Sequence, residues 1–142
     1  MSFSEQPIIP DDRYVAFCDI LGFSNRIEQD FEGTPRLYDS FASFWVKLDI
    51  TGVETCVYSD AVLITSGSLP SIISAVNALW FCAQTQSFII RGGIAKGRYW
   101  ERRVGSSLFV TSDALVRAVK IEKSIGSPMV ALADNIEVPL EL

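Results

Sequence analysis

A short apolar run that carries one carboxylate and ends in a glycine constrains the fold of this chain more than any other feature. It spans residues 13–24 and has the sequence RYVAFCDILGFS. A run this short, rich in aromatic and β-branched residues, predicts a strand buried on both faces. Asp19 then lies at the end of a buried strand, where a carboxylate is costly unless a positive charge meets it. The local pattern leaves two roles open for Asp19, namely a cap for the helix that follows the turn and a ligand for a metal ion.

The composition fits one globular domain without histidine chemistry. The chain has 142 residues, 49% of them apolar, which suffices for a sizeable core. We expect a polar arm over residues 1–12 and one domain over residues 13–142, either minimal or lacking its last elements. Histidine is absent from the sequence, which excludes Ser-His-Asp hydrolysis, His-ligated zinc and a histidine general base. Any chemistry must therefore use carboxylates, Arg, Lys, hydroxyls and hard metal ions.

Charge, cysteines and hydropathy indicate a soluble, cytoplasmic protein. The net charge of −5 argues against a surface devoted to nucleic acid or anionic lipid. Cys18, Cys56 and Cys82 are an odd number without metal-ligand spacing, and we expect them to be reduced core residues. Residues 1–7 lack the basic region and apolar run of a signal peptide, and no apolar window is long enough to span a membrane.

Turn signals and periodicity divide the chain into ten elements in the order strand, helix, helix, strand, strand, helix, strand, strand, helix, strand. The expected strands are 13–19, 53–58, 61–64, 88–95, a short exposed strand that accompanies a turn within 96–103, and 128–132. The expected helices are 23–30, 35–49, 70–84 and 112–124, with Ser24, Thr34, Ser68 and Ser112 as N-caps. Hairpins and crossover helices together predict an α+β sandwich, with a mainly antiparallel sheet, some parallel pairing and helices packed on it.

A second carboxylate and an arginine suggest a phosphate site. Asp60 lies in a two-residue turn between two apolar runs, so it meets Asp19 if the first strand pairs beside that hairpin. Two close carboxylates repel unless a cation lies between them, and oxygen ligands of this kind suit magnesium or manganese. The turn at residues 22–24 offers backbone N–H groups to phosphate oxygens. Arg91, followed by two glycines that let a backbone or a ligand come close, could bind phosphate through its planar fork.

Three stretches, FCDILGFS at 17–24, YSDAV at 58–62 and RGGIAKG at 91–97, resemble in order and spacing the signature stretches of class III nucleotidyl cyclases. A fourth, LVRAVKIE at 115–122, is similar to the late helix of that family but matches poorly. The resemblance implies the ferredoxin-like sandwich of that family. Within the family, YSD and GGIAKG look most like the short bacterial cyclases of the Pycsar antiphage system, which make cyclic UMP or cyclic CMP.

The resemblance also implies roles for individual residues. Asp19 and Asp60, with the Ile20 carbonyl, would bind two Mg²⁺ or Mn²⁺ ions that activate the ribose 3′-hydroxyl and hold the triphosphate, with pyrophosphate leaving. Gly22, Phe23 and Ser24 would surround the triphosphate, and Arg91 would neutralise phosphate charge. These matches favour the metal role for Asp19 over the cap.

Departures from the family pattern affect the base pocket and the late helix. Tyr58 could narrow the base pocket toward a pyrimidine, or it could pack in the hairpin with its hydroxyl at the surface. Cys56 stands where the family often has a base-reading Lys or Glu, which weakens a claim for ATP or GTP. Val116 and Lys120 stand where the family has Asn and Arg. Lys120 could supply the positive charge of that arginine, or Arg117 could do so if the match to the family is shifted by one helical turn. An ordinary exposed helix lysine is an equally weighted interpretation of Lys120.

The expected enzyme is a homodimeric cyclase with interfacial sites that acts on a ribonucleoside triphosphate, without membrane or nucleic-acid partners. By analogy with phage defence, its product would be read by a downstream effector. We also weigh an adenylate or guanylate cyclase, a cyclase-like domain that binds a nucleotide or a partner without chemistry, and a nucleic-acid module built on residues 96–103.

Overall fold

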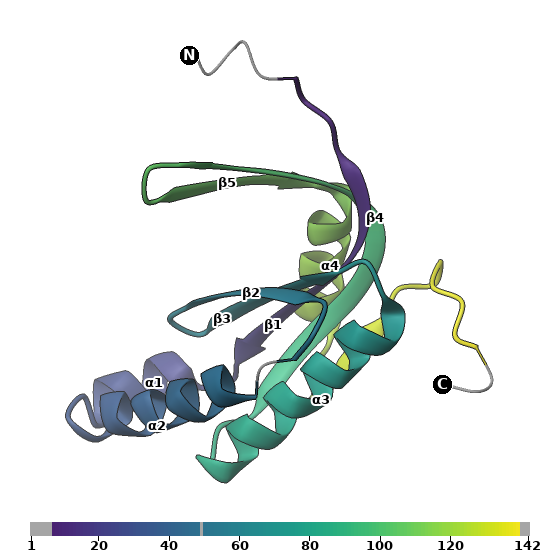
Figure 1. Ribbon diagram of the computed structural model, residues 1–142. Helices are drawn as coiled ribbons and strands as arrows, with labels where there is room; N and C mark the ends of the chain where they lie inside the picture. The colour runs from purple at the N-terminus through teal and green to yellow at the C-terminus, as the bar shows by residue number, and fades with distance from the viewer. Residues whose placement is uncertain (1–6, 49, 140–142) are drawn as a thin grey trace.

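The computed structural model describes residues 7–48 and 50–139 and contains ten elements in the predicted order. They are β1 (Asp11–Ile20), α1 (Phe23–Gln29), α2 (Gly33–Lys47), β2 (Val53–Tyr58), β3 (Ala61–Ser66), α3 (Leu69–Thr85), β4 (Ile90–Val104), β5 (Ser107–Ser112), α4 (Asp113–Ser124) and β6 (Val130–Leu132) (Figure 1). The α+β prediction is therefore confirmed. No helix among the described residues is both long and apolar enough to cross a bilayer.

One six-stranded sheet organises the fold, in the order β2-β3-β1-β4-β5 with β6 paired to β4. Every pairing is antiparallel except that of β6 with β4, which is parallel. This is the mainly antiparallel sheet with some parallel pairing that the sequence predicts. β1 lies in the middle, between β3 and β4, so the first strand does pair beside the β2–β3 hairpin.

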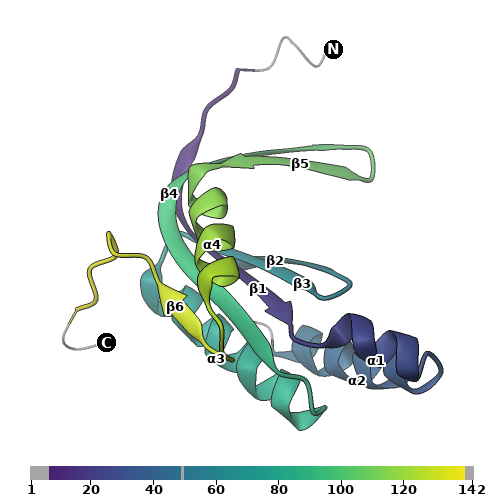
Figure 2. The ribbon, with the colours of Figure 1, turned by 180° about the vertical axis from the view of Figure 1, so that it is seen from behind.

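Helices cover the two faces of the sheet unequally. One large cluster of buried side chains joins β1, β3 and β4 to α2 and α3 on one face, and a smaller cluster joins β1 and β4 to α4 on the other. Seen from behind, α4 lies across β4 while α3 lies on the opposite side of the sheet (Figure 2). The alternation along β1 follows from this, because Ala16 and Cys18 enter the first cluster and Val15 enters the second. β1 is thus buried on both faces, as predicted.

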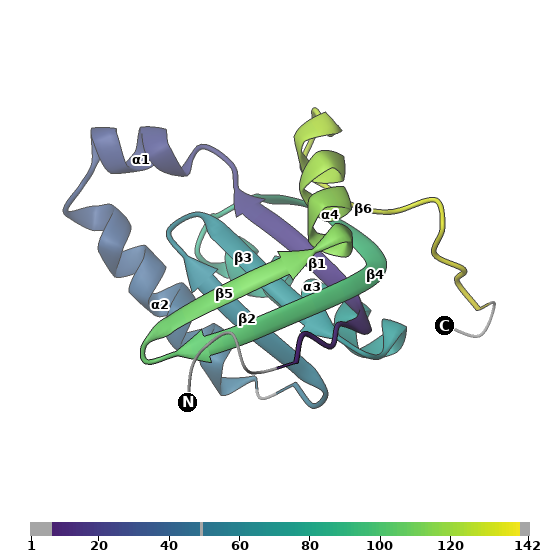
Figure 3. The same ribbon diagram turned by 90° about the horizontal axis from the view of Figure 1, so that it is seen from above.

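The β4–β5 hairpin extends from the sheet as an arm. Viewed from above, β5 passes over the β2–β3 hairpin (Figure 3), and residues of both hairpins line one narrow cavity. The sequence predicted a turn and a separate short strand within residues 96–103, and this is wrong because β4 continues unbroken through them to Val104. The next strand, β5 at Ser107–Ser112, was not predicted. The chain reverses instead at Gly105, whose φ of 61° suits glycine. The aromatic and basic residues of 96–103 therefore lie on one extended strand.

Helix caps were predicted with mixed success. Ser68 and Ser112 accept hydrogen bonds from the backbone N–H groups of Ser71 and Leu115, which confirms both as N-caps. Ser24 is not a cap, since α1 begins one residue earlier and its N-cap is Gly22, with φ 69°. Thr34 also lies inside its helix, and its hydroxyl donates to the carbonyl of Arg26. The predicted end of that helix at residue 49 lies outside the described residues.

Candidate active site

The two aspartates predicted to converge lie at neighbouring strand ends, Asp19 on β1 and Asp60 in the turn directly before β3. Asp19 is the penultimate residue of β1, and its partner on β3 is Ala61, the residue directly after Asp60. The N–H of Ile20 donates to the carbonyl of Asp60 at 2.8 Å, which ties the end of β1 to the hairpin turn. Ser59, the other turn residue, has φ 54°, a conformation in which glycine or asparagine is more usual. The fold thus brings both aspartates to one place.

Asp19 has one oxygen held by an arginine and one without a partner. Arg91 lies directly opposite Asp19 on β4, and its Nη2 is 3.2 Å from Oδ2 of Asp19. Within the described part of the chain, Oδ1 of Asp19 is buried and accepts no hydrogen bond. A buried carboxylate oxygen without a donor is costly, and a cation would satisfy it.

Glu122 of α4, a residue to which the sequence motifs assign no role, completes an ion-pair cluster with Arg91 and Asp19 in which Glu122 is buried and the other two side chains are partly exposed. Nε and Nη2 of Arg91 lie 2.9 and 2.8 Å from the same Oε1 of Glu122, and Nη1 donates to the carbonyl of Ile125 at 3.1 Å. The Glu122 side chain is only 4% exposed. Burial raises the pKa of Glu122, as does its proximity to Asp19, while Arg91 opposes the rise.

The sequence contained a signal for Glu122. It stands four and eight residues after Ala118 and Ala114, and these three residues form the buried stripe of α4. An acid in such a stripe needs a buried cation, and Arg91 is the matching one. The hydrogen bond to Asp19 and both carboxylates in turn raise the pKa of Arg91.

The predicted triphosphate turn lies directly after β1. Gly22 has a left-handed conformation and precedes α1, so the first backbone N–H groups of α1 follow Asp19 closely in the chain. Phe23 is 6% exposed and packs against Tyr38 and Phe88, so its side chain belongs to the core and only its backbone can face a ligand. Ser24 is exposed.

The predicted base-facing residues lie on β2, at the outer edge of the sheet. Tyr58 is 81% exposed, so it does not pack in the hairpin of its own chain. Cys56 is also exposed, which contradicts the expectation that all three cysteines are core residues; β2 is an edge strand whose outer side chains lie away from the helices. Cys18 and Cys82 are buried, as predicted.

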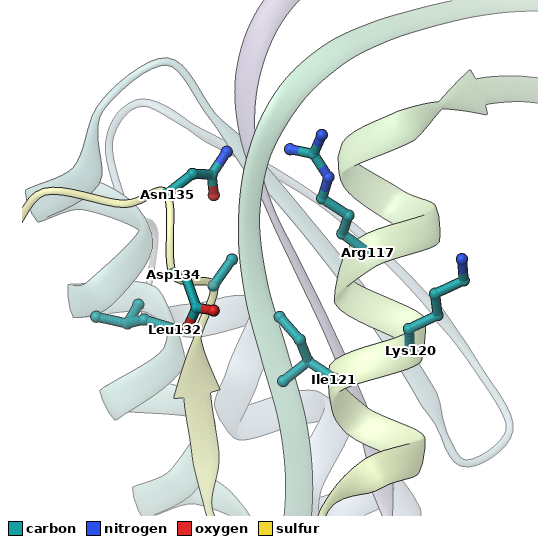
Figure 4. Close-up of a pocket in the computed structure, with 7 residues that line it drawn as sticks. Arg117, Lys120, Ile121, Leu132, Asp134 and Asn135 are labelled. Carbon is teal, nitrogen blue, oxygen red and sulfur yellow. The ribbon is translucent and has the colours of Figure 1, made fainter.

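The late-helix cations lie away from the aspartates. Arg117 and Lys120 line a cavity of about 420 Å³ between α4 and the segment Leu132–Asn135. In Figure 4 the Arg117 side chain extends from α4 toward β4, and Lys120 lies on the side of α4 turned away from β4. Arg117 donates to the carbonyl of Lys96 at 3.4 Å, and Lys120 is exposed. Val116 is exposed too. Among the contacts of the described residues, none joins Lys120 or Arg117 to Asp19, Asp60 or Arg91.

The donor set can be tested against a divalent metal. Within the described residues no three acidic or cysteine side chains gather as a metal-binding cluster. Glu122 is engaged by Arg91. Asp19, Asp60 and the adjoining Ile20 nevertheless offer hard oxygen donors, and the unpartnered Oδ1 of Asp19 lacks the positive charge that an ion would supply. The residues therefore fit a magnesium-type ion that takes its remaining ligands from a substrate.

With this geometry in view, the fold can be compared with known proteins. Neither protein-family models nor curated proteins match the sequence. Solved structures do match, and they show that the chain has the fold of class III adenylyl and guanylyl cyclase domains.

Two solved cyclases and one nucleotide-binding relative illustrate the similarity. The adenylyl cyclase CyaB from P. aeruginosa aligns with a TM-score of 0.73 at 14% identity, over 91% of this chain and 80% of that one. The guanylyl cyclase Cya2 aligns with a TM-score of 0.71 at 9% identity, over 90% and 77%. A class III adenylyl cyclase-like ATP-binding protein from Pseudomonas aeruginosa aligns with a TM-score of 0.64 at 12% identity, over 88% and 34%.

Proposed function

We propose that this protein is a nucleotide cyclase that converts a ribonucleoside triphosphate into its 3′,5′-cyclic nucleotide and pyrophosphate. The observation that carries the proposal is the pair of Asp19, at the end of β1, and Asp60, in the turn before the adjoining β3, with one buried Asp19 oxygen lacking a partner among the described residues. The similarity to solved adenylyl and guanylyl cyclases supports it.

In the proposed mechanism, Asp19, Asp60 and the Ile20 carbonyl hold two Mg²⁺ or Mn²⁺ ions. When bound, these ions supply Lewis acidity that activates the ribose 3′-hydroxyl for in-line attack and offsets charge on the triphosphate. The backbone N–H groups of Gly22, Phe23 and Ser24 orient phosphate oxygens at the start of α1. Arg91 adds positive charge beside Asp19, so it reduces the net negative charge of the site even while it is bound to Glu122.

The preferred substrate in this proposal is UTP or CTP. Tyr58 projects into solvent from β2 in the single chain, so its ring is available to contact a base or a second subunit. Cys56 cannot offer the charge or the hydrogen-bonding fork with which a Lys or Glu would read a purine. A pyrimidine cyclase of this kind would act as the signal producer in antiphage defence, with a separate effector that senses the cyclic nucleotide.

We further propose that the working unit is a homodimer whose active sites form between subunits. Arg117 and Lys120 line a cavity apart from Asp19 and Asp60 of the same chain. This placement agrees with a dimer in which the late-helix cations of one subunit contact the substrate bound to the aspartates of the other. In that arrangement Lys120 or Arg117 would stabilise charge on the phosphates during transfer.

The direct test is incubation of the purified protein with each of ATP, GTP, CTP and UTP and Mn²⁺, followed by chromatography for cyclic product. We expect cyclic UMP or cyclic CMP to predominate. A folded dimer that turns over none of the four would refute the catalytic proposal, and a purine product would refute the pyrimidine assignment.

A second candidate is a domain that binds a nucleotide without chemistry. The ion pair of Arg91 with Asp19 favours it, because this pair partly compensates Asp19 in the absence of a metal. One structure with this fold is an adenylyl cyclase-like ATP-binding protein. Nucleotide binding that depends on Mn²⁺ but yields no product would select this alternative.

A further inference from the structure

We propose that Glu122 is a positioning residue for the metal site, acting through Arg91 on Asp19. The inference rests on the proposed function only in that Asp19 is taken as a metal ligand. It assigns a role to a residue that the sequence matches did not single out, on an element, α4, remote from Asp19 in the chain.

Glu122 fixes the direction of the Arg91 side chain. Two nitrogens of the guanidinium bind the same Oε1 of Glu122, and the third binds the carbonyl of Ile125 just after α4. A guanidinium held at all three nitrogens cannot rotate without losing several charge-assisted hydrogen bonds. α4 therefore sets the orientation of Arg91.

The orientation of Arg91 decides which oxygen of Asp19 is free. Nη2 binds Oδ2 at 3.2 Å, so a carboxylate that could otherwise rotate is held by one oxygen. Oδ1 is left buried with no hydrogen-bond partner in the described structure. Glu122 and Arg91 thus hold Oδ2 of Asp19 in an ion pair and leave Oδ1 available to bind a cation.

The neighbouring packing keeps Glu122 in place. β4 approaches α4 at Gly93, where an added Cβ would lie 2.7 Å from the carbonyl oxygen of Ala118 and 2.7 Å from Cβ of Ile121. With the Glu122 side chain 4% exposed, water cannot readily replace it as the acceptor for Arg91.

The test measures Mn²⁺ affinity of the folded protein by the electron paramagnetic resonance signal of free Mn²⁺, without nucleotide. Glu122→Leu removes the acceptor oxygens at similar size, and we expect Mn²⁺ affinity to fall by roughly 10- to 100-fold, as is typical when a partner of a metal ligand is lost. Glu122→Gln keeps Oε1 as an acceptor and is expected to recover most of the affinity. Glu137→Gln, which neutralises an exposed acid, serves as the matched control and is expected to bind like the wild type.

A purely structural role for Glu122 would lower the melting temperature of the Leu variant but leave the Mn²⁺ affinity of its folded form unchanged, and this result would overturn the proposal. Equal losses in the Gln and Leu variants would also overturn it, since charge rather than placement would then matter. If Glu122→Leu does not fold, Arg91→Lys decides, because a single ammonium nitrogen lacks the planar fork whose separate nitrogens hold Asp19, Glu122 and Ile125. We expect it to weaken Mn²⁺ binding about 10-fold, and unchanged binding would contradict the inference.

The two proposals fail separately. A wild-type protein that binds Mn²⁺ but makes no cyclic product refutes the cyclase function, while the comparison of Glu122 variants still decides the positioning role. A wild-type protein that makes cyclic product, with Mn²⁺ affinity insensitive to Glu122, refutes the positioning role alone.

Discussion

Replacement of Gly93 by alanine tests how closely α4 must approach the sheet. In the structure, the added Cβ would lie 2.7 Å from the Ala118 carbonyl oxygen, 2.7 Å from Ile121 Cβ and 2.8 Å from Ile121 Cγ2. All three atoms belong to the backbone of α4 or to a stiff β-branched side chain, so none can move aside without shifting the helix. The smaller of the two buried clusters, between α4 and the sheet, would loosen.

We expect Gly93→Ala to lower the free energy of unfolding by about 2 kcal/mol, within the usual range for overpacking. For a domain of this size the melting temperature should then fall by roughly 6–8 °C. Urea unfolding followed by circular dichroism gives the free energy, and a thermal scan gives the temperature.

Gly67→Ala is the matched control, because an added Cβ at Gly67 meets no atom within 4 Å and its φ is not positive. We expect its free energy of unfolding to stay within about 0.5 kcal/mol of the wild type or to rise slightly. If Gly93→Ala unfolds at the same urea concentration as Gly67→Ala, the close contact between β4 and α4 is not as described, and the placement of Glu122 loses its support.

Three further experiments address the site and the edge strand. Asp60→Asn should abolish cyclic product while the melting temperature stays within a few degrees of the wild type; a retained rate would mean that the metal site is misplaced. Tyr58→Ala should leave the fold intact and raise turnover of ATP or GTP relative to UTP or CTP, and an unchanged preference would remove Tyr58 from base selection. In native protein at pH 8, a thiol reagent should label Cys56 alone, because it is exposed while burial raises the pKa of Cys18 to about 12 and Cys82 is buried. Labelling of more than one thiol per chain before unfolding would contradict the burial of Cys18 and Cys82.

Local signals predicted the elements of this fold well. The order of strands and helices, the caps at Ser68 and Ser112 and the two-sided burial of β1 all follow from periodicity and turn chemistry, which act over a few residues. The error at residues 96–103 arose because Lys96 and Gly97 look like turn residues, whereas pairing of β4 with β1 and β5 extends the strand through them.

The glycines after Arg91 show where local reasoning stops. Their pattern predicted that a backbone or a ligand comes close, without deciding which. In the structure, Gly92 lies against the backbone of β1 and Sγ of Cys18, and Gly93 lies against α4. Protein atoms therefore fill the space at both positions. Cys56 was misjudged for a related reason, since an apolar neighbourhood in sequence does not reveal that β2 is the edge of the sheet.

The sequence by itself determined the element order, the α+β class and the prediction that Asp19 and Asp60 converge, because hydrophobic spacing and a two-residue hairpin turn constrain strand ends directly. Only the tertiary structure decided what Arg91 contacts, that Glu122 lies beside it, and that one Asp19 oxygen has no hydrogen-bond partner among the described residues. The physical reason is that these contacts join residues 31 to 72 positions apart, and which side chains meet across β1, β4 and α4 depends on strand register and helix packing.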